Sequence, residues 1–172
     1  ELNEARSVQL SLFPAWTPDI SGFEISGLCI PCREVGGDWF DYILLQDGKL
    51  GLVLGDVSGK GTGAALLMAS ARSIIRMFAE RGLPPGEVLL NVNRILVADL
   101  PRTRFVTMIY AIIDPASKSI LFANAGHLPP IFTDSKGLRF LDSDSGLPLG
   151  IQEGTFAEQR VEMSPRSSLL LY

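Results

Sequence analysis

Two aspartates, each directly preceded by a glycine, lie close together in the chain. Asp38 follows the segment Val35-Gly36-Gly37, and Asp56 ends an apolar run and precedes Val57 and the glycine-rich segment SGKGTG. A strand that ends in aspartate carries a carboxylate out of the core, and neighbouring glycines let other groups approach the backbone closely. Carboxylate, carbonyl and water oxygens are the ligands that Mg²⁺ and Mn²⁺ prefer. The pattern therefore predicts a metal site at Asp38 and Asp56, with the carbonyl oxygen of Val57 as a further candidate ligand.

The glycine-rich segment also suggests a phosphate-binding loop, but its spacing does not match the known motifs. Lys60 lacks the Gly-Lys-Thr order of a P-loop, and the G-x-G-x-x-G spacing is not met. The charge of Asp56 would repel a phosphate group unless a cation lay between them. A metal ion that receives the phosphate removes this conflict, so a nucleotide-binding loop is the weaker alternative.

The elements that position these residues can be predicted from the spacing of apolar side chains. Segment 50–57 is predicted to be a strand, and a helix capped by Thr62 is expected to run to about Arg81. A second helix is predicted over 86–100, after two prolines. The apolar face of the first of these helices would consist of Leu66, Leu67, Ser70, Ile74 and Phe78. Further strands are predicted at 22–31, 38–45, 104–113, 119–124, about 131, 138–141, 160–163 and 168–172.

Strands that come in runs around one pair of helices, with short hairpin links, favour an α+β fold with antiparallel sheets. A further amphipathic helix is predicted over the first twelve residues and ends before Pro14. This helix either packs on the domain or continues a linker from an upstream module. We therefore divide the chain into a linker or N-terminal helix at 1–13 and one domain at 14–172.

Composition limits the possible functions. The chain has 172 residues, a formal charge of −4 and no cluster of basic residues, which argues against a nucleic-acid partner. No apolar stretch approaches the length needed to cross a membrane, and the charged opening segment ELNEAR is not a signal peptide. We expect a cytoplasmic domain without membrane contact, cut from a longer protein because no initiator Met is present.

Cys29 and Cys32 form a C-x-x-C pair, for which reduced thiols are favoured over a redox pair or half of a zinc site.

Five segments occur in an order that resembles a known family. They are VGGDWFDY, GDVSGKGTGAALLM, FVTMIYAIID, NAGHLPP and GLPLGI. Over nearly the whole chain, this order resembles the PPM-type (type 2C-like) metal-dependent serine/threonine phosphatases, in the branch of the sporulation stage II E phosphatase and the sigma-factor regulators. The resemblance implies an α-β-β-α sandwich, in which helices flank two antiparallel sheets and a centre of two Mn²⁺ or Mg²⁺ ions lies between the sheets. It also implies that Asp56 bridges both ions, that the Val57 carbonyl binds one of them and that Asp38 serves the same centre.

The implied reaction is hydrolysis of phosphoserine or phosphothreonine by a water that the two metal ions activate. Arg33 is a candidate catalytic residue that orients the phosphate, since a guanidinium matches a phosphate group, or else it is a solvated surface arginine. Asp41 either supports the site or faces a turn. His127 is either hydrogen-bonded to a loop, the favoured role, or a general acid. Lys60 either helps to hold an anion or is solvated.

The resemblance also implies partners and an incomplete site. Relatives continue from LLLY into Thr-Asp-Gly, which supplies a further metal ligand, and another ligand lies near their C-terminus. We therefore expect the domain to lack its C-terminal part, to hold metal weakly and to have little or no activity; a natural non-catalytic relative is the alternative. The expected substrate is a phosphorylated regulatory protein of the anti-sigma-factor antagonist type, with a sensor domain upstream. A non-catalytic phosphoprotein-binding module is the alternative function, and an exposed sheet edge makes a homodimer possible.

Overall fold

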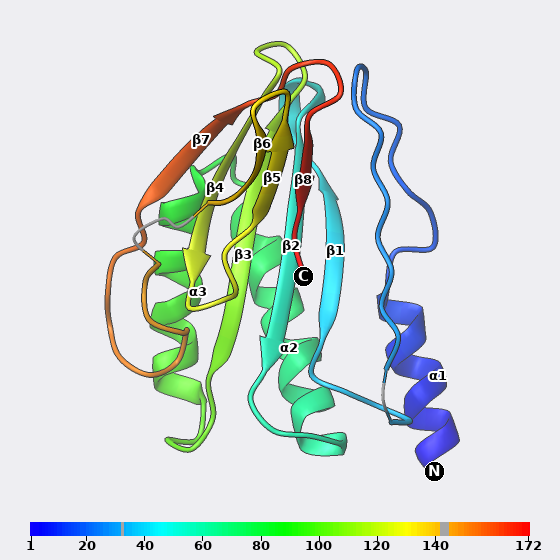
Figure 1. The fold of residues 1–172 in the computed structure, drawn as a ribbon. Coiled ribbons are helices and arrows are strands. Elements are labelled where there is room, and N and C mark those ends of the chain that lie inside the picture. The colour runs from blue at the N-terminus through cyan, green and yellow to red at the C-terminus, as the bar shows by residue number, and fades with distance from the viewer. Residues whose placement is uncertain (32, 142–144) are drawn as a thin grey trace.

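The computed structural model describes residues 1–31, 33–141 and 145–172. Its strands form two antiparallel sheets (Figure 1). The five-stranded sheet has the order β1-β2-β3-β4-β7 and the three-stranded sheet has the order β6-β5-β8. The larger sheet consists of β1 (Trp39–Leu44), β2 (Leu50–Val57), β3 (Val106–Asp114), β4 (Ser119–Ala125) and β7 (Glu158–Glu162). The smaller one consists of β5 (Ile131–Asp134), β6 (Gly137–Phe140) and β8 (Ser168–Leu170).

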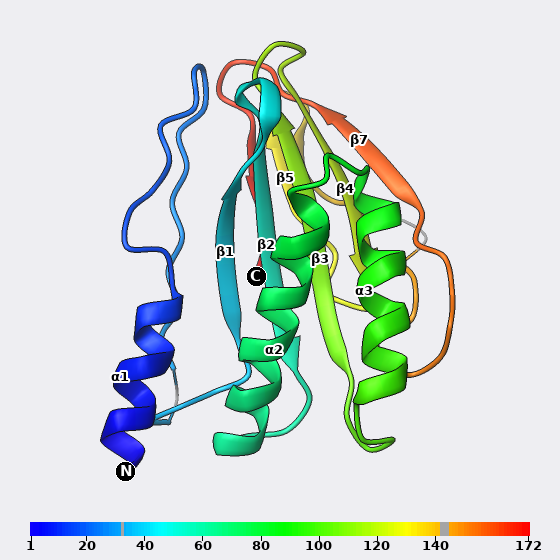
Figure 2. The same ribbon diagram turned by 180° about the vertical axis from the view of Figure 1, so that it is seen from behind.

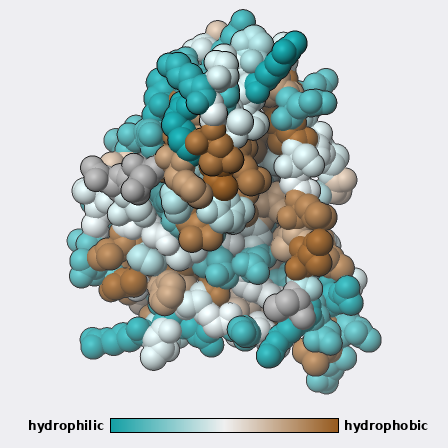
Figure 3. Space-filling model, in the orientation of Figure 1, coloured by the Kyte–Doolittle hydropathy of each residue, from teal (hydrophilic) through white to brown (hydrophobic). Residues whose placement is uncertain are grey.

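The helices cover one face of the larger sheet. Helices α2 (Thr62–Ala79) and α3 (Pro85–Asp99) lie against that face (Figure 2), and α1 (Leu2–Leu12) lies beside α2. The three-stranded sheet lies on the opposite face of the larger sheet (Figure 1). This arrangement confirms the predicted α+β fold with two antiparallel sheets. No helix in the described part of the chain covers the outer face of the smaller sheet, where apolar side chains reach the surface (Figure 3).

Side chains alternate between the two faces of β1 and β2, as the strand period requires. Ile43 and Val57 belong to the core under the helices, whereas Leu52 packs against the core between the two sheets. By the same alternation, Asp41 faces the helices and Asp56 faces the space between the sheets. Asp41 and Asp56 therefore lie on opposite faces of the larger sheet, and this separation gives them different roles.

The predicted strand at 22–31 does not form. The segment makes only an isolated bridge between Ile20 and Phe23. It lies against side chains of β1, since a Cβ atom on Gly27 would lie 2.6 Å from both the Phe40 ring and the Tyr42 hydroxyl. Apolar composition alone indicated a strand, but a strand also needs a partner for its backbone.

The predicted inward face of α2 is wrong except at Phe78, which is buried. The buried residues follow a neighbouring stripe, and Leu66 of the predicted face is 68% exposed. Alanines in the buried stripe let the helix approach the sheet closely, whereas the predicted stripe carries larger leucines. Thr62 is the first helical residue and not the cap, which is Gly61 at φ 74°. The buried residues are Ala64, Met68, Ala71, Ile75, Phe78 and Ala79.

Among the described residues, no helix has the length and apolar character needed to span a membrane.

Candidate metal centre

Asp38 and Asp56 meet at one end of the larger sheet. Trp39 of β1 pairs with Gly55 of β2, so the register places the residues that precede Trp39 and follow Gly55 side by side. The carboxyl groups of Asp38 and Asp56 consequently lie close to each other. Burial first, and then the nearby charge of Asp38, together raise the pKa of Asp56 to about 6. Two carboxylates held this close repel each other, and a divalent cation between them would remove the repulsion.

Gly37 allows this meeting because it lies against the backbone of Val57. A Cβ atom on Gly37 would lie 2.6 Å from the carbonyl oxygen of Val57, closer than real Cβ contacts. The N–H of Val57 donates to the carbonyl of Gly37 at 3.3 Å. The two glycine-flanked aspartate segments are thus held together by direct backbone contact, and the Val57 carbonyl lies beside the segment that carries Asp38.

Thr107 and His127 extend the same end of the sheet. Thr107 is the register partner of Asp56, and its hydroxyl lies 2.8 Å from Nδ1 of His127. The other ring nitrogen, Nε2, lies 3.1 Å from the carbonyl oxygen of Tyr172. Burial lowers the pKa of His127, while the Tyr172 carbonyl and then the charge of Asp38 oppose that change. Because both ring nitrogens have partners, the geometry favours the structural role for this histidine.

The turn that presents His127 is held by Asn124. The side-chain oxygen of Asn124 accepts from the N–H of His127 at 2.8 Å. Its amide group donates to the carbonyl of the same histidine at 3.0 Å. This reciprocal pair explains the asparagine at the start of the NAGH segment, three residues before the histidine, and it fixes the loop next to the site.

Arg104 was not predicted from the sequence, yet it supports the glycine-rich loop. Its guanidinium donates to the carbonyl of Ser58 and lies against Gly59. The hydroxyl of Ser58 also accepts from the N–H of Phe105 at 2.9 Å. The register pairs Val57 with Val106, which brings the residues before β3 next to those after β2. Only that register identifies Arg104, because in the sequence it is merely the first residue of a predicted strand. Lys60 of the same loop is exposed.

Arg33 is not brought to the carboxylate pair by any contact in the described structure. Its side chain is exposed, and no hydrogen bond or ion pair of it is found among the described residues. Its phosphate-orienting role stays a prediction.

Cys29 is a free thiol whose pKa is raised by burial and then by the charge of Asp38, which does not favour a reactive thiolate. Cys32, the second cysteine of the pair, lies outside the described residues.

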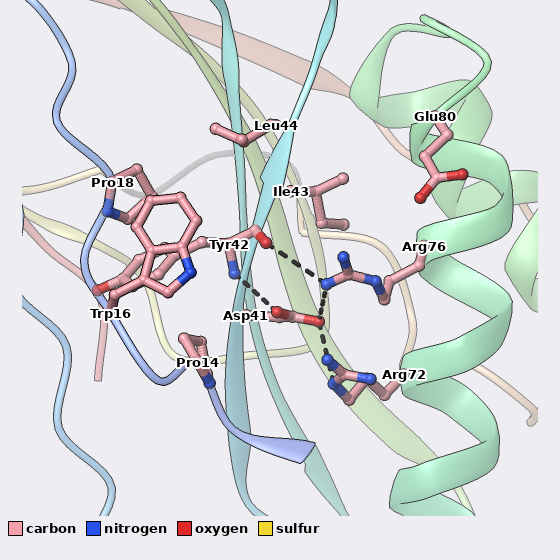
Figure 4. Close-up of a pocket in the computed structure, with 10 residues that line it drawn as sticks. All are labelled: Pro14, Trp16, Pro18, Asp41, Tyr42, Ile43, Leu44, Arg72, Arg76 and Glu80. Carbon is pink, nitrogen blue, oxygen red and sulfur yellow. Dashed lines mark hydrogen bonds and ion pairs between the residues drawn. The ribbon is translucent and has the colours of Figure 1, made fainter. Parts of the chain in front are cut away.

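Asp41 has neither of the two roles that the sequence left open. It is 2% exposed and forms ion pairs with Arg76 at 2.7 Å and Arg72 at 3.0 Å, both on α2 (Figure 4). One of its oxygens also accepts from the N–H of Tyr42. This cluster joins β1 to α2 on the helix side of the sheet. It lines a cavity of about 290 Å³ together with Trp16, and neither Asp38 nor Asp56 lines that cavity. The cavity is therefore separate from the carboxylate pair.

Replacing Asp41 by alanine is expected to destabilise the protein, because two arginines would lose their buried anionic partner. We expect a loss of about 2–4 kcal/mol in the free energy of unfolding, since breaking one side of a buried pair is costly. The melting temperature would fall by about 5–10 °C, measured by circular dichroism. Lys49→Ala is the control, because it breaks an ion pair with Asp114 in which the lysine side chain is 40% exposed. The melting temperature of this variant should change little. Equal melting temperatures for Asp41→Ala and the wild type would contradict this role.

The donor set fits a hard divalent cation. The half-buried carboxylate of Asp56 lies beside the exposed carboxylate of Asp38, and a backbone carbonyl lies against the segment that carries Asp38. These are oxygen ligands, and Mg²⁺ commonly keeps several waters beside one or two carboxylates. Within the described ranges, no group of three or more His, Cys, Asp or Glu side chains gathers in a metal-binding arrangement. The described ligands are therefore a partial set that water or further groups would complete.

Comparison with known proteins gives consistent matches. Residues 46–172 match the family model described as "Stage II sporulation protein E (SpoIIE)". Protein IcfG from Synechocystis sp. is 28% identical over 200 residues, which covers 100% of this chain and 32% of that protein. Phosphoserine phosphatase RsbU from Bacillus subtilis is 29% identical over 154 residues, which covers 89% of this chain and 46% of that protein. The chain thus spans a third to a half of the length of these relatives.

A solved structure agrees with these sequence matches. The crystal structure of the RsbU and RsbW domains of Rv1364c from Mycobacterium tuberculosis superposes with a TM-score of 0.71 at 30% identity. The match covers 81% of this chain and 39% of that one. Similarity therefore extends from the sequence motifs to the arrangement of the two sheets and their helices.

Proposed function

The chain belongs to the stage II sporulation protein E family of PPM-type phosphatases, and we propose that it is a metal-dependent serine/threonine phosphatase domain. The proposed reaction removes phosphate from phosphoserine or phosphothreonine on a regulatory protein. The observation that carries the proposal is the close approach of Asp38 and Asp56, two carboxylates that the register of β1 and β2 places side by side. Relatives named as phosphoserine phosphatases, RsbU among them, support the same reaction.

Each residue has a proposed task in this reaction. Asp56 and Asp38 would hold Mn²⁺ or Mg²⁺, with the Val57 carbonyl as a third ligand. Bound cations would supply an activated water and would stabilise charge on the transferred phosphoryl group. Arg33 would orient the phosphate from the exposed side, since a guanidinium binds two phosphate oxygens at once. Arg104 would keep the glycine-rich loop in place beside Val57 through its bond to Ser58.

The proposed substrate is a phosphorylated regulatory protein of the anti-sigma-factor antagonist type. This proposal rests on the family and on relatives such as RsbU, since the surface itself does not identify a partner. We further propose that residues 1–13 join the domain at 14–172 to an upstream sensor, that the protein works in the cytoplasm and that homodimers form. Weak metal binding, with only two carboxylates among the described ligands, stays part of the proposal.

A non-catalytic phosphoprotein-binding module is the second candidate. A protein that had lost catalysis would be free to lose its metal-binding carboxylates, yet Asp38 and Asp56 are both present and in contact. We therefore favour the enzyme over the binding module.

Hydrolysis of a phosphoserine peptide by the full-length protein tests the proposal. We expect phosphate release that depends on Mn²⁺ or Mg²⁺, stops when EDTA removes the metal and returns when the metal is restored. An unphosphorylated serine peptide serves as the control for background phosphate. A folded protein that binds the phosphopeptide but releases no phosphate at any metal concentration would contradict the enzyme and support the binding module.

A further inference from the structure

Gln9 of α1 contacts the loop that carries Asp38. Its side-chain nitrogen, Nε2, donates to the carbonyl oxygen of Gly36 at 2.7 Å. Its side-chain oxygen, Oε1, accepts from the N–H of Gly36 at 3.0 Å. The side chain thus satisfies both backbone groups of one residue, as a neighbouring strand would. Gln9 and Gly36 are 27 residues apart, so the contact joins two distant parts of the chain.

The burial of Gln9 shows that this contact is a specific one. Gln9 is 6% exposed and is the only buried residue of α1, whereas Leu2, Val8 and Leu10 of the same helix are largely exposed. A buried amide without partners is costly, but here both of its polar atoms are hydrogen-bonded. The most buried position of the helix is therefore used for hydrogen bonding to the loop, whereas Leu12 at the end of the helix packs against the core.

The loop needs this support because two successive glycines give it little stiffness of its own. Val35, before the glycines, is 3% exposed, and Gly37 accepts from the N–H of Val57. Gly36 lies between these two attachments, and Gln9 holds its backbone N–H and carbonyl. With Gly36 fixed, the backbone that leads to Asp38 is held from both α1 and β2.

We propose that Gln9 is a positioning residue that fixes the Asp38 segment, so that the carboxylate of Asp38 stays in place against Asp56 for metal binding. The inference rests on the proposed function for its catalytic consequence, but the contact itself can be tested without catalysis. It also gives the first helix a direct part in the site, which a flexible linker would not have. A small displacement of a ligand-bearing segment is enough to lower affinity and rate strongly.

Gln9→Met in the full-length protein tests this proposal, because methionine has a similar length but cannot make either hydrogen bond. We expect the Gly36 amide of the metal-free protein to exchange with solvent about tenfold faster, measured by NMR. We also expect about a tenfold weaker affinity for Mn²⁺, measured by direct titration, and a matching rise in the Mn²⁺ concentration for half-maximal phosphatase activity. Asn3→Met changes an exposed amide on the same helix and should leave all three quantities unchanged.

Gln9→Glu provides a second variant, which keeps the acceptor for the Gly36 N–H but loses the donor for its carbonyl. It should weaken Mn²⁺ affinity in the same direction, and it keeps the test available if the methionine variant folds poorly. An unchanged Mn²⁺ affinity in a folded variant overturns the proposal, whether or not the Gly36 amide exchanges faster. Absence of Mn²⁺ binding and phosphatase activity in the wild type would contradict the proposed function instead, and the exchange rates would still decide whether Gln9 holds the loop.

Discussion

Replacing Asp56 by asparagine is expected to abolish phosphatase activity while making the metal-free protein more stable. The two effects have one cause, the loss of the negative charge that Asp56 carries beside Asp38. Asparagine keeps the size of the side chain but removes the charge that would bind a cation. We expect a loss of about a thousandfold in metal-dependent hydrolysis, since the metal contributes several kcal/mol to the transition state.

The gain in stability follows from the direction of the pKa shift. The pKa of Asp56 rises from 3.8 to about 6 on folding, so ionisation of this group favours the unfolded chain. Metal-free wild type therefore loses stability as the pH rises through this window, and the asparagine variant does not. After allowance for solvent screening, the difference at pH 7 is about 1 kcal/mol, or about 2–4 °C in melting temperature.

Calorimetry of the metal-free proteins between pH 4 and 8, with phosphate release measured in Mn²⁺, checks both effects together. Asp19→Asn, at an exposed position, is the control and should alter neither quantity. An asparagine variant at position 56 that is less stable than the wild type at pH 7, or that keeps most of its activity, would contradict the assignment of this carboxylate.

Replacing Gly37 by alanine is expected to lower activity about a hundredfold, although the change adds one methyl group. The new Cβ atom would lie 2.6 Å from the carbonyl oxygen and 3.2 Å from the nitrogen of Val57. Because these are backbone atoms of a paired strand, they cannot move away cheaply, and the Asp38 segment must shift instead. A displacement of about 1 Å at a ligand is enough for a loss of this size.

Gly36→Ala is a matched control for this variant, because no atom lies within 4 Å of a Cβ atom at position 36. It should retain activity within about twofold of the wild type, as surface changes usually do. The measurement is the Mn²⁺ dependence of phosphate release for both variants beside their melting temperatures. Equal activities of the two alanine variants would show that close approach of Gly37 to Val57 does not matter for the site.

Much of the architecture follows from the sequence alone. Strand β2 has the predicted bounds, and α2, α3 and most other strands begin or end within a few residues of prediction. Hydrophobic periodicity and turn residues act over short stretches of chain, so they determine such elements locally. The glycine-flanked aspartates identified the candidate site for the same reason, since each lies where a patterned segment meets a turn.

Tertiary structure decided which side chains share a face and which distant residues meet. Asp41 lies three residues from Asp38, yet it faces α2 and forms ion pairs with Arg72 and Arg76. Gln9 and Arg104 reach the site segments only because α1 packs beside the Gly36 loop and β3 pairs with β2. No local pattern identifies the hydrogen-bond partner of either residue, because a long-range hydrogen bond depends on two segments whose packing the local sequence does not specify. Short-range patterns determined the elements and the two aspartates of this protein, and only the packing of those elements decided what supports them.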